Sequence, residues 1–560
     1  MLPPFKLGEQ LIKIREAAAE REAERRASQF GLPYFNAARA PVKVEVLKMI
    51  PEERARKLQA AAFEVKKPNL AIAVINPERA DVKKLIDEFR VQGYAPKLFI
   101  ASLPGVEHLW SFYQFVTPEK PPITSRVNIE RSQILKLTAE LEGLPNVGKA
   151  VTAFDIENAS VTEFLEITLA GALANRASDI HFEPEEKAVK LRYRIDGILN
   201  DIAKDLSRAF YPSLVSRIKL LSNLKINVSD RPQDGRFTIG LTGKDVEIRV
   251  AIAPSEFGEI IVMRVLDPDV INLSLSDLGF RPDDLALVGE ELKKPNGMVL
   301  NTGPTGSGKT TTLYAFLKAK HTPEIKIITV EDPIEYHLAG IEQTQVDEEA
   351  GYTFANGLKS LMRQDPDVIL VGEVRDKDTA EIAIQAALTG HLVFSTIHAN
   401  DAAGAIPRFL DLGVKPTSVS PALNLIIAQR LVRRLCELCK KSIKPSRDLK
   451  SKIRKFLEEL PPRVERALYT EIKTFMPVGC ERCHNGYKGR IAIFELLSND
   501  HKKLEDLISK ESGESPIQAY ALESGMVTMQ TDGILKVALG ITTLSEVEEA
   551  TGPLEWERKN

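Results

Sequence analysis

A glycine-rich segment at residues 303–310, Gly-Pro-Thr-Gly-Ser-Gly-Lys-Thr, limits the possible folds of this chain more than any other part of the sequence. It fits the phosphate-binding pattern G-x-x-x-x-G-K-[ST]. It follows a predicted strand at 297–302 and precedes a helical pattern through Leu313 and Phe316. In this setting a strand leads into a loop whose backbone N–H groups surround phosphate oxygens, and the helix N-terminus adds a favourable dipole. The segment therefore predicts a wound parallel α/β sheet with a nucleotide site at a strand end.

Within this segment, Lys309 would reach the β- and γ-phosphates and Thr310 would offer its hydroxyl to Mg²⁺. A glycine-rich turn without a nucleotide is the alternative, and the strand and helix on either side argue against it. The expected nucleotide-binding residues are Gly303, Pro304, Thr305, Gly306, Ser307, Gly308, Lys309, Thr310 and Thr311.

Three further strand ends carry polar side chains. The apolar run 368–371 ends in Gly372 and Glu373, the form of a Walker B motif with Glu where many P-loop enzymes have Asp. Acidic residues at 331–335 follow a strand predicted at 325–330, where catalysis and a solvated turn are both plausible. His398 follows a strand predicted at 391–395 and could contact a γ-phosphate, although a single histidine is more often structural.

All four cysteines fall into two Cys-x-x-Cys pairs, Cys436 with Cys439 and Cys480 with Cys483. Four thiolates at this spacing are a ligand set for tetrahedral structural Zn²⁺. Redox-active or unliganded thiols are the alternatives, and the sequence has no thioredoxin-like unit around them. We expect a closed zinc site in an insert over residues 436–483.

Length and composition exclude several classes of protein. A chain of 560 residues suggests about three or four domains, and 43% hydrophobic with 27% charged residues is ordinary globular composition. A formal net charge of −3 gives no overall basic field, so nucleic acid is not an expected partner. No apolar run approaches the roughly 20 residues of a membrane-spanning helix, and the N-terminus lacks a signal-peptide layout. We therefore expect a cytoplasmic protein.

Changes in composition divide the chain into five parts. In 37–116, helical patterns at 51–62 and 79–90 alternate with β-like runs at 70–75 and 98–101. The parts are an exposed N-terminal helix (1–36) with a thin apolar stripe of Leu7, Leu11 and Ile14, a small α/β domain (37–116), a linker with one helix at 129–142 (117–155), an α+β module (156–270), and the phosphate-binding domain (271–560) with C-terminal helices over 496–560.

The α+β module is defined by its periodicity. A helical segment at 161–174 precedes alternating apolar residues at 188–195, 246–252 and 259–266, which predict strands. The linker before this module begins with a proline- and charge-rich stretch at 117–126. We therefore expect the domain at 37–116 and this module to be joined by a flexible tether.

Together these motifs resemble those of the secretion ATPase superfamily, which contains the motors of type II secretion and type IV pili. The resemblance extends from about residue 155 to the end of the chain. It rests on 303–310 as the Walker A motif, 331–335 as the Asp box, 363–376 as the Walker B motif, 396–401 as the His box, 177–184, 192–197, 231–236 and 258–259 in the second N-terminal domain, and 525–533 with 540–543 in the C-terminal helices.

The resemblance implies a RecA-like ATPase domain after a PAS-like α+β domain, and a first N-terminal domain that docks on an inner-membrane platform protein. It also implies a homo-hexamer with ATP and Mg²⁺ bound between subunits. Glu331 would be the general base, Glu373 would order Mg²⁺ and water, and His398 would contact the γ-phosphate; the water-orienting role could instead belong to Glu373. Candidate arginine fingers that act on a neighbouring subunit are Arg194, Arg217, Arg249 and Arg264, each of which could equally be an ion-paired surface residue.

The resulting expectation is a hexameric, Mg-ATP-hydrolysing cytoplasmic motor, peripheral to the inner membrane, that drives type IV pilus or pseudopilus assembly. The cysteine insert resembles that of assembly motors rather than retraction motors. A conjugation or DNA-uptake ATPase and a nucleotide-gated scaffold with little turnover are the alternatives. The pair of carboxylates Glu331 and Glu373 favours turnover over a scaffold. Only Lys6–Glu9 faintly resembles the family's cyclic-dinucleotide segment, so no second-messenger site is expected.

Overall fold

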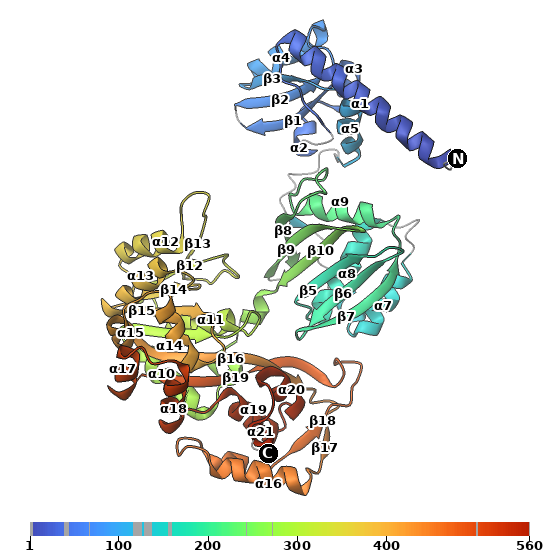
Figure 1. The fold of residues 1–560 in the computed structure, drawn as a ribbon. Coiled ribbons are helices and arrows are strands. Elements are labelled where there is room, and N and C mark those ends of the chain that lie inside the picture. Colours follow the sequence, from blue (N-terminus) through green and yellow to red (C-terminus); the bar gives the residue numbers. More distant parts are fainter. Residues whose placement is uncertain are drawn as a thin grey trace. The chain divides into compact units, whose positions relative to one another are not determined.

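A computed structural model describes residues 4–37, 44–66, 68–115, 126–127, 137–154, 160–241, 244–271, 273–499 and 502–558. The chain separates into two compact units (Figure 1). The first consists of Met1–Arg194 and Leu199–Val265, and the second of Ile195–Ile198 and Leu266–Asn560.

The N-terminal part of the first unit is a three-stranded sheet in the order β1-β2-β3, in which β1 and β2 are antiparallel and β2 and β3 parallel. Its core includes Ala23 and Ala27, so one side of the N-terminal helix packs on this domain, while residues such as Glu24 and Arg25 are exposed as expected. The side chains of Leu7, Leu11 and Ile14 lie outside the described residues. The elements are α1 (Pro4–Phe30), α2 (Val44–Leu47), α3 (Glu52–Leu58), β1 (Ala60–Lys66), β2 (Asn69–Val74), α4 (Ala80–Val91), β3 (Ala95–Ile100) and α5 (Leu103–Ser111).

The helix expected over 51–62 is wrong at its C-terminal end. α3 stops at Leu58, Gln59 adopts a left-handed φ of 52°, and β1 starts at Ala60. Residues 60–62 are alanines, which favour helix locally, but all three are buried in the sheet. Burial against the sheet therefore overrides local propensity.

The second sheet has the order β4-β8-β9-β10-β5-β6-β7. Part of the expected linker belongs to this fold, because β4 pairs with β8 and the Val147 side chain of α7 fits against Gly171 of α8. The first part of the helix expected at 129–142 lies outside the described residues. The elements are β4 (Arg126–Val127), α7 (Leu144–Thr152), α8 (Val161–Ala174), β5 (Asp179–Pro184), β6 (Val189–Ile195), β7 (Ile198–Leu206), α9 (Tyr211–Leu221), β8 (Gln233–Leu241), β9 (Lys244–Ser255) and β10 (Gly258–Leu266).

The second unit is built on a seven-stranded sheet in the order β13-β12-β14-β15-β11-β16-β19. Every neighbouring pair is parallel except the edge pair β16 and β19. The strands are β11 (Gly297–Thr302), β12 (Ile327–Glu331), β13 (Glu342–Gln345), β14 (Val368–Val371), β15 (Leu392–Ile397), β16 (Leu423–Leu435) and β19 (Tyr487–Ser498).

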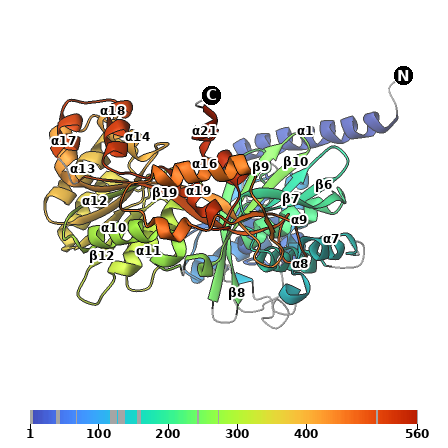
Figure 2. The same ribbon diagram turned by 90° about the horizontal axis from the view of Figure 1, so that it is seen from below.

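Helices cover both faces of this sheet (Figure 2). Alternate strand residues serve separate cores: Val299 packs with α10 (Pro282–Lys293) and α11 (Lys309–Lys320), whereas Met298 and Leu300 pack on the opposite face. Strands buried on both faces read as continuous apolar runs, as in 368–371 and in the first four residues of β11, 297–300. The helices of the opposite face are α12 (Phe354–Leu361), α13 (Lys377–Leu388), α14 (Ala402–Asp411), α15 (Pro416–Ala422), α17 (Lys502–Ser509) and α18 (Glu514–Glu523).

The insert between β16 and β19 holds a two-stranded antiparallel sheet and the helix that connects its strands, namely β17 (Lys441–Ile443), α16 (Arg447–Glu458) and β18 (Thr474–Met476). The chain then ends in α19 (Met529–Ala538), α20 (Leu544–Thr551) and α21 (Glu555–Arg558).

A buried charge network joins the start of α10 to α19. The Arg281 guanidinium lies 2.6 Å from Asp284 and 3.1 Å from Asp532, and all three side chains are almost completely buried. Burial raises the pKa of Asp284 to about 6, against the opposing charge of Arg281. Arg281 therefore compensates carboxylates that have little access to water.

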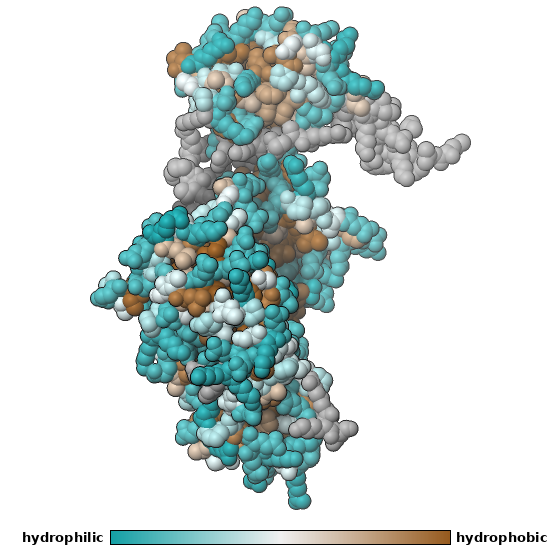
Figure 3. All heavy atoms as spheres, turned by 60° about the vertical axis from the view of Figure 1, so that its left-hand side comes forward, coloured by the Kyte–Doolittle hydropathy of each residue, from teal (hydrophilic) through white to brown (hydrophobic). Residues whose placement is uncertain are grey.

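Among the described residues, no helix is long and apolar enough to cross a membrane. On the face drawn in Figure 3, hydrophilic residues predominate and hydrophobic ones form separate small groups.

Arg281→Met should destabilise the second unit by about 3 kcal/mol at pH 8, because it removes the buried cation shared by Asp284 and Asp532 and leaves them only Arg463 and Lys536, respectively. The folded-state pKa of Asp284 already exceeds its ordinary value of 3.8. The folded protein holds this proton more tightly than the unfolded chain does. The contribution of Asp284 to the free energy of unfolding therefore falls as pH rises from 3.8 to about 6. Since the variant raises the pKa of Asp284 further, the loss of unfolding free energy should be smaller at pH 5 than at pH 8.

Urea denaturation at both pH values measures this loss, with the exposed Lys293→Met as control. Equal losses at the two pH values would contradict the account.

Candidate functional site

The loop at 303–310 connects β11 directly to α11, in the middle of the parallel sheet. Gly303, Gly306 and Gly308 have φ values of 143°, 80° and 90°, which side-chain-bearing residues rarely adopt. A Cβ on Gly303 would also lie 2.4 Å from the carbonyl oxygen of Gln429. Glycine is therefore required at these turns, and the loop leaves backbone N–H groups free to approach an anion at the helix N-terminus.

Gln429 of β16 holds this loop from the side, and sequence reasoning missed it. Its Nε2 donates to the Ser307 carbonyl at 2.9 Å, and its Oε1 accepts from Thr312 at 2.8 Å and Asn301 at 3.1 Å. Gln429 is buried. The position of Gln429 directly after the apolar residues 425–428 was the available signal.

Lys309 already lies against the loop. Its Nζ donates to the carbonyls of Gly303 at 2.7 Å and Pro304 at 3.1 Å. Burial lowers the pKa of Lys309, and the nearby charge of Glu373 acts in the opposite direction. Thr310 is exposed at the mouth of the loop, whereas the buried Ser307 hydroxyl has no hydrogen-bond partner among the described residues.

Threonine hydroxyl groups connect neighbouring strand ends by hydrogen bonds. The Thr302 hydroxyl lies 2.9 Å from the carbonyls of Ile397 and Ala399 and accepts the Ala399 N–H at 2.8 Å. Thr396 donates to the Gly372 carbonyl at 2.8 Å. The loop that carries His398 is thus attached to β11 on one side and to the end of β14 on the other.

Glu373 and His398 meet at this edge. His398 Nε2 lies 3.5 Å from Glu373 Oε2, and Arg375 forms an ion pair with the other carboxylate oxygen. The Glu373 hydrogen bond raises the pKa of Arg375. Glu373 also acts electrostatically on Lys309, so the structure places Lys309 near the pair of Glu373 and His398.

Glu331 ends β12 but faces away from this group. Its Oε1 accepts hydrogen bonds from Thr329 at 2.6 Å and Gln343 at 3.1 Å, and its Oε2 accepts one from the Tyr314 hydroxyl of α11. Only 4% of Glu331 is exposed. Burial, followed by the charge of Glu331, raises the pKa of Tyr314. In this conformation Glu331 links α11, β12 and β13, with no free oxygen at the mouth of the loop.

The four candidate arginines all belong to the first unit, whereas the phosphate-binding loop belongs to the second. Arg264 and Arg194 both pair with Asp179, at 3.1 and 3.5 Å, and Arg249 pairs with Glu247 at 3.2 Å. Arg217 is half-buried, and this burial lowers its pKa.

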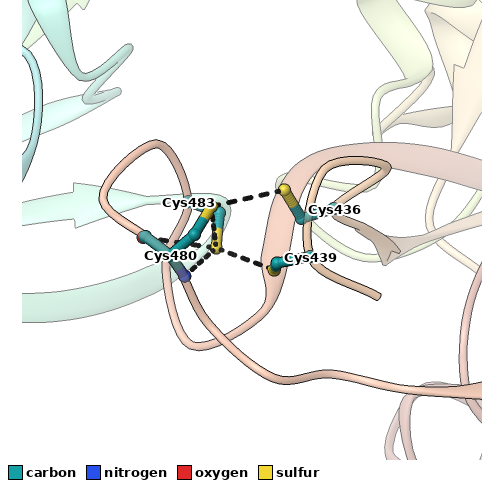
Figure 4. Close-up of side chains that lie close together, drawn as sticks. All are labelled: Cys436, Cys439, Cys480 and Cys483. Carbon is teal, nitrogen blue, oxygen red and sulfur yellow. Dashed lines mark hydrogen bonds between the residues drawn. The ribbon is translucent and has the colours of Figure 1, made fainter. Parts of the chain in front are cut away.

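The four cysteines converge from the end of β16 and from the loop before β19 (Figure 4). Their sulfurs all lie within 4.8 Å of one another, with Cys436 to Cys480 at 3.9 Å and Cys439 to Cys483 at 3.6 Å. A tetrahedral ion with metal–sulfur bonds of about 2.3 Å separates its ligands by about 3.8 Å. All four thiols are free. The cluster therefore has the composition and spacing to hold a metal ion.

Comparison with known proteins confirms the resemblance to secretion ATPases over most of the chain. A family model described as "Type II/IV secretion system protein" matches residues 155–549. The type IV pilus assembly ATPase PilB of Myxococcus xanthus is 35% identical over 551 residues, 98% of this chain and 94% of that protein. The type II secretion system protein E of Pseudomonas aeruginosa is 44% identical over 397 residues, 70% of this chain and 76% of that protein.

Among solved structures, the ATPase DotB of Legionella pneumophila is similar with a TM-score of 0.50. The match covers 70% of this chain and 96% of DotB at 21% sequence identity. At this identity the likeness concerns the fold alone.

Gln429→Ala should destabilise the second unit by about 2 kcal/mol, because the Ser307 carbonyl, Asn301 and Thr312 lose a buried partner. It should also weaken Mg-ADP binding, since the loop is no longer held from β16. Thermal unfolding with and without Mg-ADP measures both effects, with Gln385→Ala on the exposed side of α13 as control. Unchanged nucleotide affinity would show that Gln429 does not position the loop.

Proposed function

Because this chain belongs to the type II/IV secretion system protein family, we propose that it is an ATP-hydrolysing motor that drives type IV pilus assembly. The main support is the PilB relative, which covers nearly the whole chain, including the N-terminal 150 residues that the family model leaves unmatched. The phosphate-binding loop beside Glu373 and His398 supplies the matching chemistry.

Type II secretion is the second candidate. It is favoured by the higher identity, 44%, to the type II secretion protein over 397 residues. Both candidates use the same motor, so the assignments below hold for either.

The proposal includes finer assignments. The second unit would be a RecA-like ATPase domain, and residues 156–270 a PAS-like domain. Residues 37–116 would dock on an inner-membrane platform protein, which places the motor at the cytoplasmic face of that membrane. We further propose a homo-hexamer in which one or more of Arg194, Arg217, Arg249 and Arg264 act on the neighbouring subunit. The pairs that Arg194 and Arg264 make with Asp179 would then have to open.

At the nucleotide site, Lys309 would leave the carbonyls of Gly303 and Pro304 to neutralise phosphate charge, and Thr310 would help to hold Mg²⁺. Bound Mg-ATP supplies the phosphoryl group that water attacks. Glu373 would orient that water and accept its proton, because its carboxylate lies at the loop edge beside His398. Glu331, expected as the base, would instead hold α11 in place through Tyr314.

The cysteine cluster would hold a structural Zn²⁺. Four thiolates leave no open coordination position, so the ion would fix the insert to the end of β16 rather than take part in hydrolysis.

Glu373→Gln should lower the rate of phosphate release from Mg-ATP by about 100-fold or more while Mg-ATP binding is kept, because the amide cannot accept the proton. Phosphate release in hexamer and monomer fractions separated by size measures this rate, with Glu381→Gln of α13, whose side chain is 44% exposed, as control. Turnover concentrated in the hexamer is expected.

Glu331→Gln is the decisive comparison. If this variant stays folded and binds Mg-ATP but loses as much turnover as Glu373→Gln, then Glu331 is the base. Tight ATP binding without turnover by the wild type in every fraction would favour a nucleotide-gated scaffold.

The purified protein should carry about one Zn²⁺ per chain, and Cys439→Ser should lose it and unfold at a lower temperature. Metal analysis by mass spectrometry with thermal unfolding measures this, and Ser442→Ala in the same insert is the control. A metal-free wild type with four reactive thiols would contradict the zinc assignment.

A further inference from the structure

Glu495 of β19 is a buried carboxylate between the starts of two helices. Its Oε1 accepts a hydrogen bond from the Ala402 N–H of α14 at 2.9 Å, and its Oε2 accepts one from the Met529 N–H of α19 at 3.4 Å. Only 3% of Glu495 is exposed. One side chain therefore joins a C-terminal helix to the helix that directly follows the His398 loop (residues 398–401).

The capping side chains of the two helices serve other N–H groups. Asp401, the N-cap of α14, accepts a hydrogen bond from Gly404 at 2.7 Å. Thr528, the N-cap of α19, accepts one from Thr531 at 3.1 Å. The first N–H group of each helix has no partner inside its own helix. Glu495 supplies the acceptor for both, where the two helix dipoles also favour a negative charge.

The His398 loop is held by hydrogen bonds at both of its ends. Near its start, the Ala399 N–H donates to the Thr302 hydroxyl at 2.8 Å. At its end, Glu495 holds the first residue of α14. Because His398 lies 3.5 Å from Glu373, the position of this loop affects the carboxylate that we propose to activate water.

A cavity of about 450 Å³ opens beside Glu495. Among the described residues that line it, Asp401 and Glu555 are the other acidic ones and Arg430 is the only basic one, while α18, α19 and α20 contribute uncharged residues. Behind this lining, the Glu514 side chain of α18 contacts Asp401. A polar cavity of this size admits water, so protons can reach the Glu495 carboxylate.

Glu495 changes its charge near neutral pH. Burial raises its pKa to about 7, and the charges of Asp401 and Glu555 act in the same direction, against the hydrogen bonds from the two helices. In the neutral form one carboxyl oxygen carries a proton that opposes a helix N–H group. Proton uptake therefore removes one of the two hydrogen bonds.

We propose that Glu495 is a positioning residue for ATP hydrolysis, and that only its ionised form holds α14 and α19 together in the arrangement that supports turnover. Proton uptake ends their joint attachment to β19, so the His398 loop is held less firmly beside Glu373. The inference rests on the proposed motor function and adds regulation by protons to the same site.

The pH dependence of phosphate release from Mg-ATP by the full-length protein tests the proposal. Glu495→Gln keeps the size of the side chain but has a single acceptor oxygen and no charge at any pH, so it imitates the neutral form. We expect the ratio of wild-type to variant kcat to be close to one at pH 6 and about five at pH 8, the loss expected from one hydrogen bond. The KM for Mg-ATP should change by less than about twofold, because the phosphate-binding loop is not altered. The ratio cancels titrations that both proteins share, including that of His398.

Glu555→Gln tests the titration independently. It removes a nearby negative charge without altering either hydrogen bond, so it lowers the pKa of Glu495. The rise in turnover should therefore occur at lower pH, with a rate at pH 8 like that of the wild type. Glu505→Gln, at an exposed position of α17 outside the cavity, is the matched control and should leave the pH profile unchanged.

Thermal unfolding at pH 8 separates this role from a purely structural one. Because the folded-state pKa of Glu495 exceeds its ordinary value of 4.5, the contribution of this group to stability falls as pH rises from 4.5 to about 7. The neutral amide avoids the cost of burying the charge. Glu495→Gln should therefore unfold at the same or a higher temperature than the wild type at pH 8, although it hydrolyses Mg-ATP more slowly.

Three outcomes would overturn the proposal: the same kcat ratio at pH 6 and pH 8, an unshifted pH profile in Glu555→Gln, or a loss of turnover in Glu495→Gln that is matched by a lower unfolding temperature. Any of these with normal wild-type turnover would reject this inference alone. A wild type that releases no phosphate at any pH would reject the proposed motor, and this inference with it.

Discussion

Parallel pairing of β12, β14, β15, β11 and β16 is the constraint on which the candidate site depends. Parallel strands have their carboxyl ends at one edge, so loops that are far apart in sequence open side by side. Lys309, Glu373 and His398, which span 90 residues of sequence, are brought together in this way. Burial of the sheet on both faces keeps the edge in register, because a shift would expose apolar residues of both cores.

Parallel pairing alone would leave these loops free to move independently. Thr302, Thr396 and Gln429 remove that freedom by hydrogen bonding each loop to its neighbour. The phosphate-binding loop is therefore hydrogen bonded to β16, and the preceding strand end to the loop that carries His398. A further bond, from Tyr314 to Glu331, ties the helix after the loop to the strands at the far side of the sheet. Hydrogen bonds thus connect the site to β16 on one side of the sheet and to the edge strand β13 on the other.

Much of the fold could be predicted because its signals are local. The expected runs at 297–302 and 368–371 coincide with β11 and β14, and the expected helix at 161–174 coincides with α8. The predicted secondary structure was wrong where burial, rather than local propensity, determined it. The alanines at 60–62 became a strand, and the polar-looking linker supplied β4 and α7 to the second sheet. In the long strands β16 and β19, apolar and charged residues alternate only at one end. The sequence pattern therefore did not predict either strand as one continuous element.

The sequence by itself determined the chemistry available to this protein: a phosphate-binding loop that only glycines can form, carboxylates and a histidine at strand ends, and two cysteine pairs with metal-ligand spacing. These follow from residue type and short spacing, which a single chain displays directly. Only the tertiary structure decided which carboxylate faces the loop. Glu331 and Glu373 both follow apolar strands, but Tyr314 and Gln343, 17 and 12 residues from Glu331, enclose one of them and leave the other beside His398. Side-chain burial depends on packing between distant segments, and no local pattern records it.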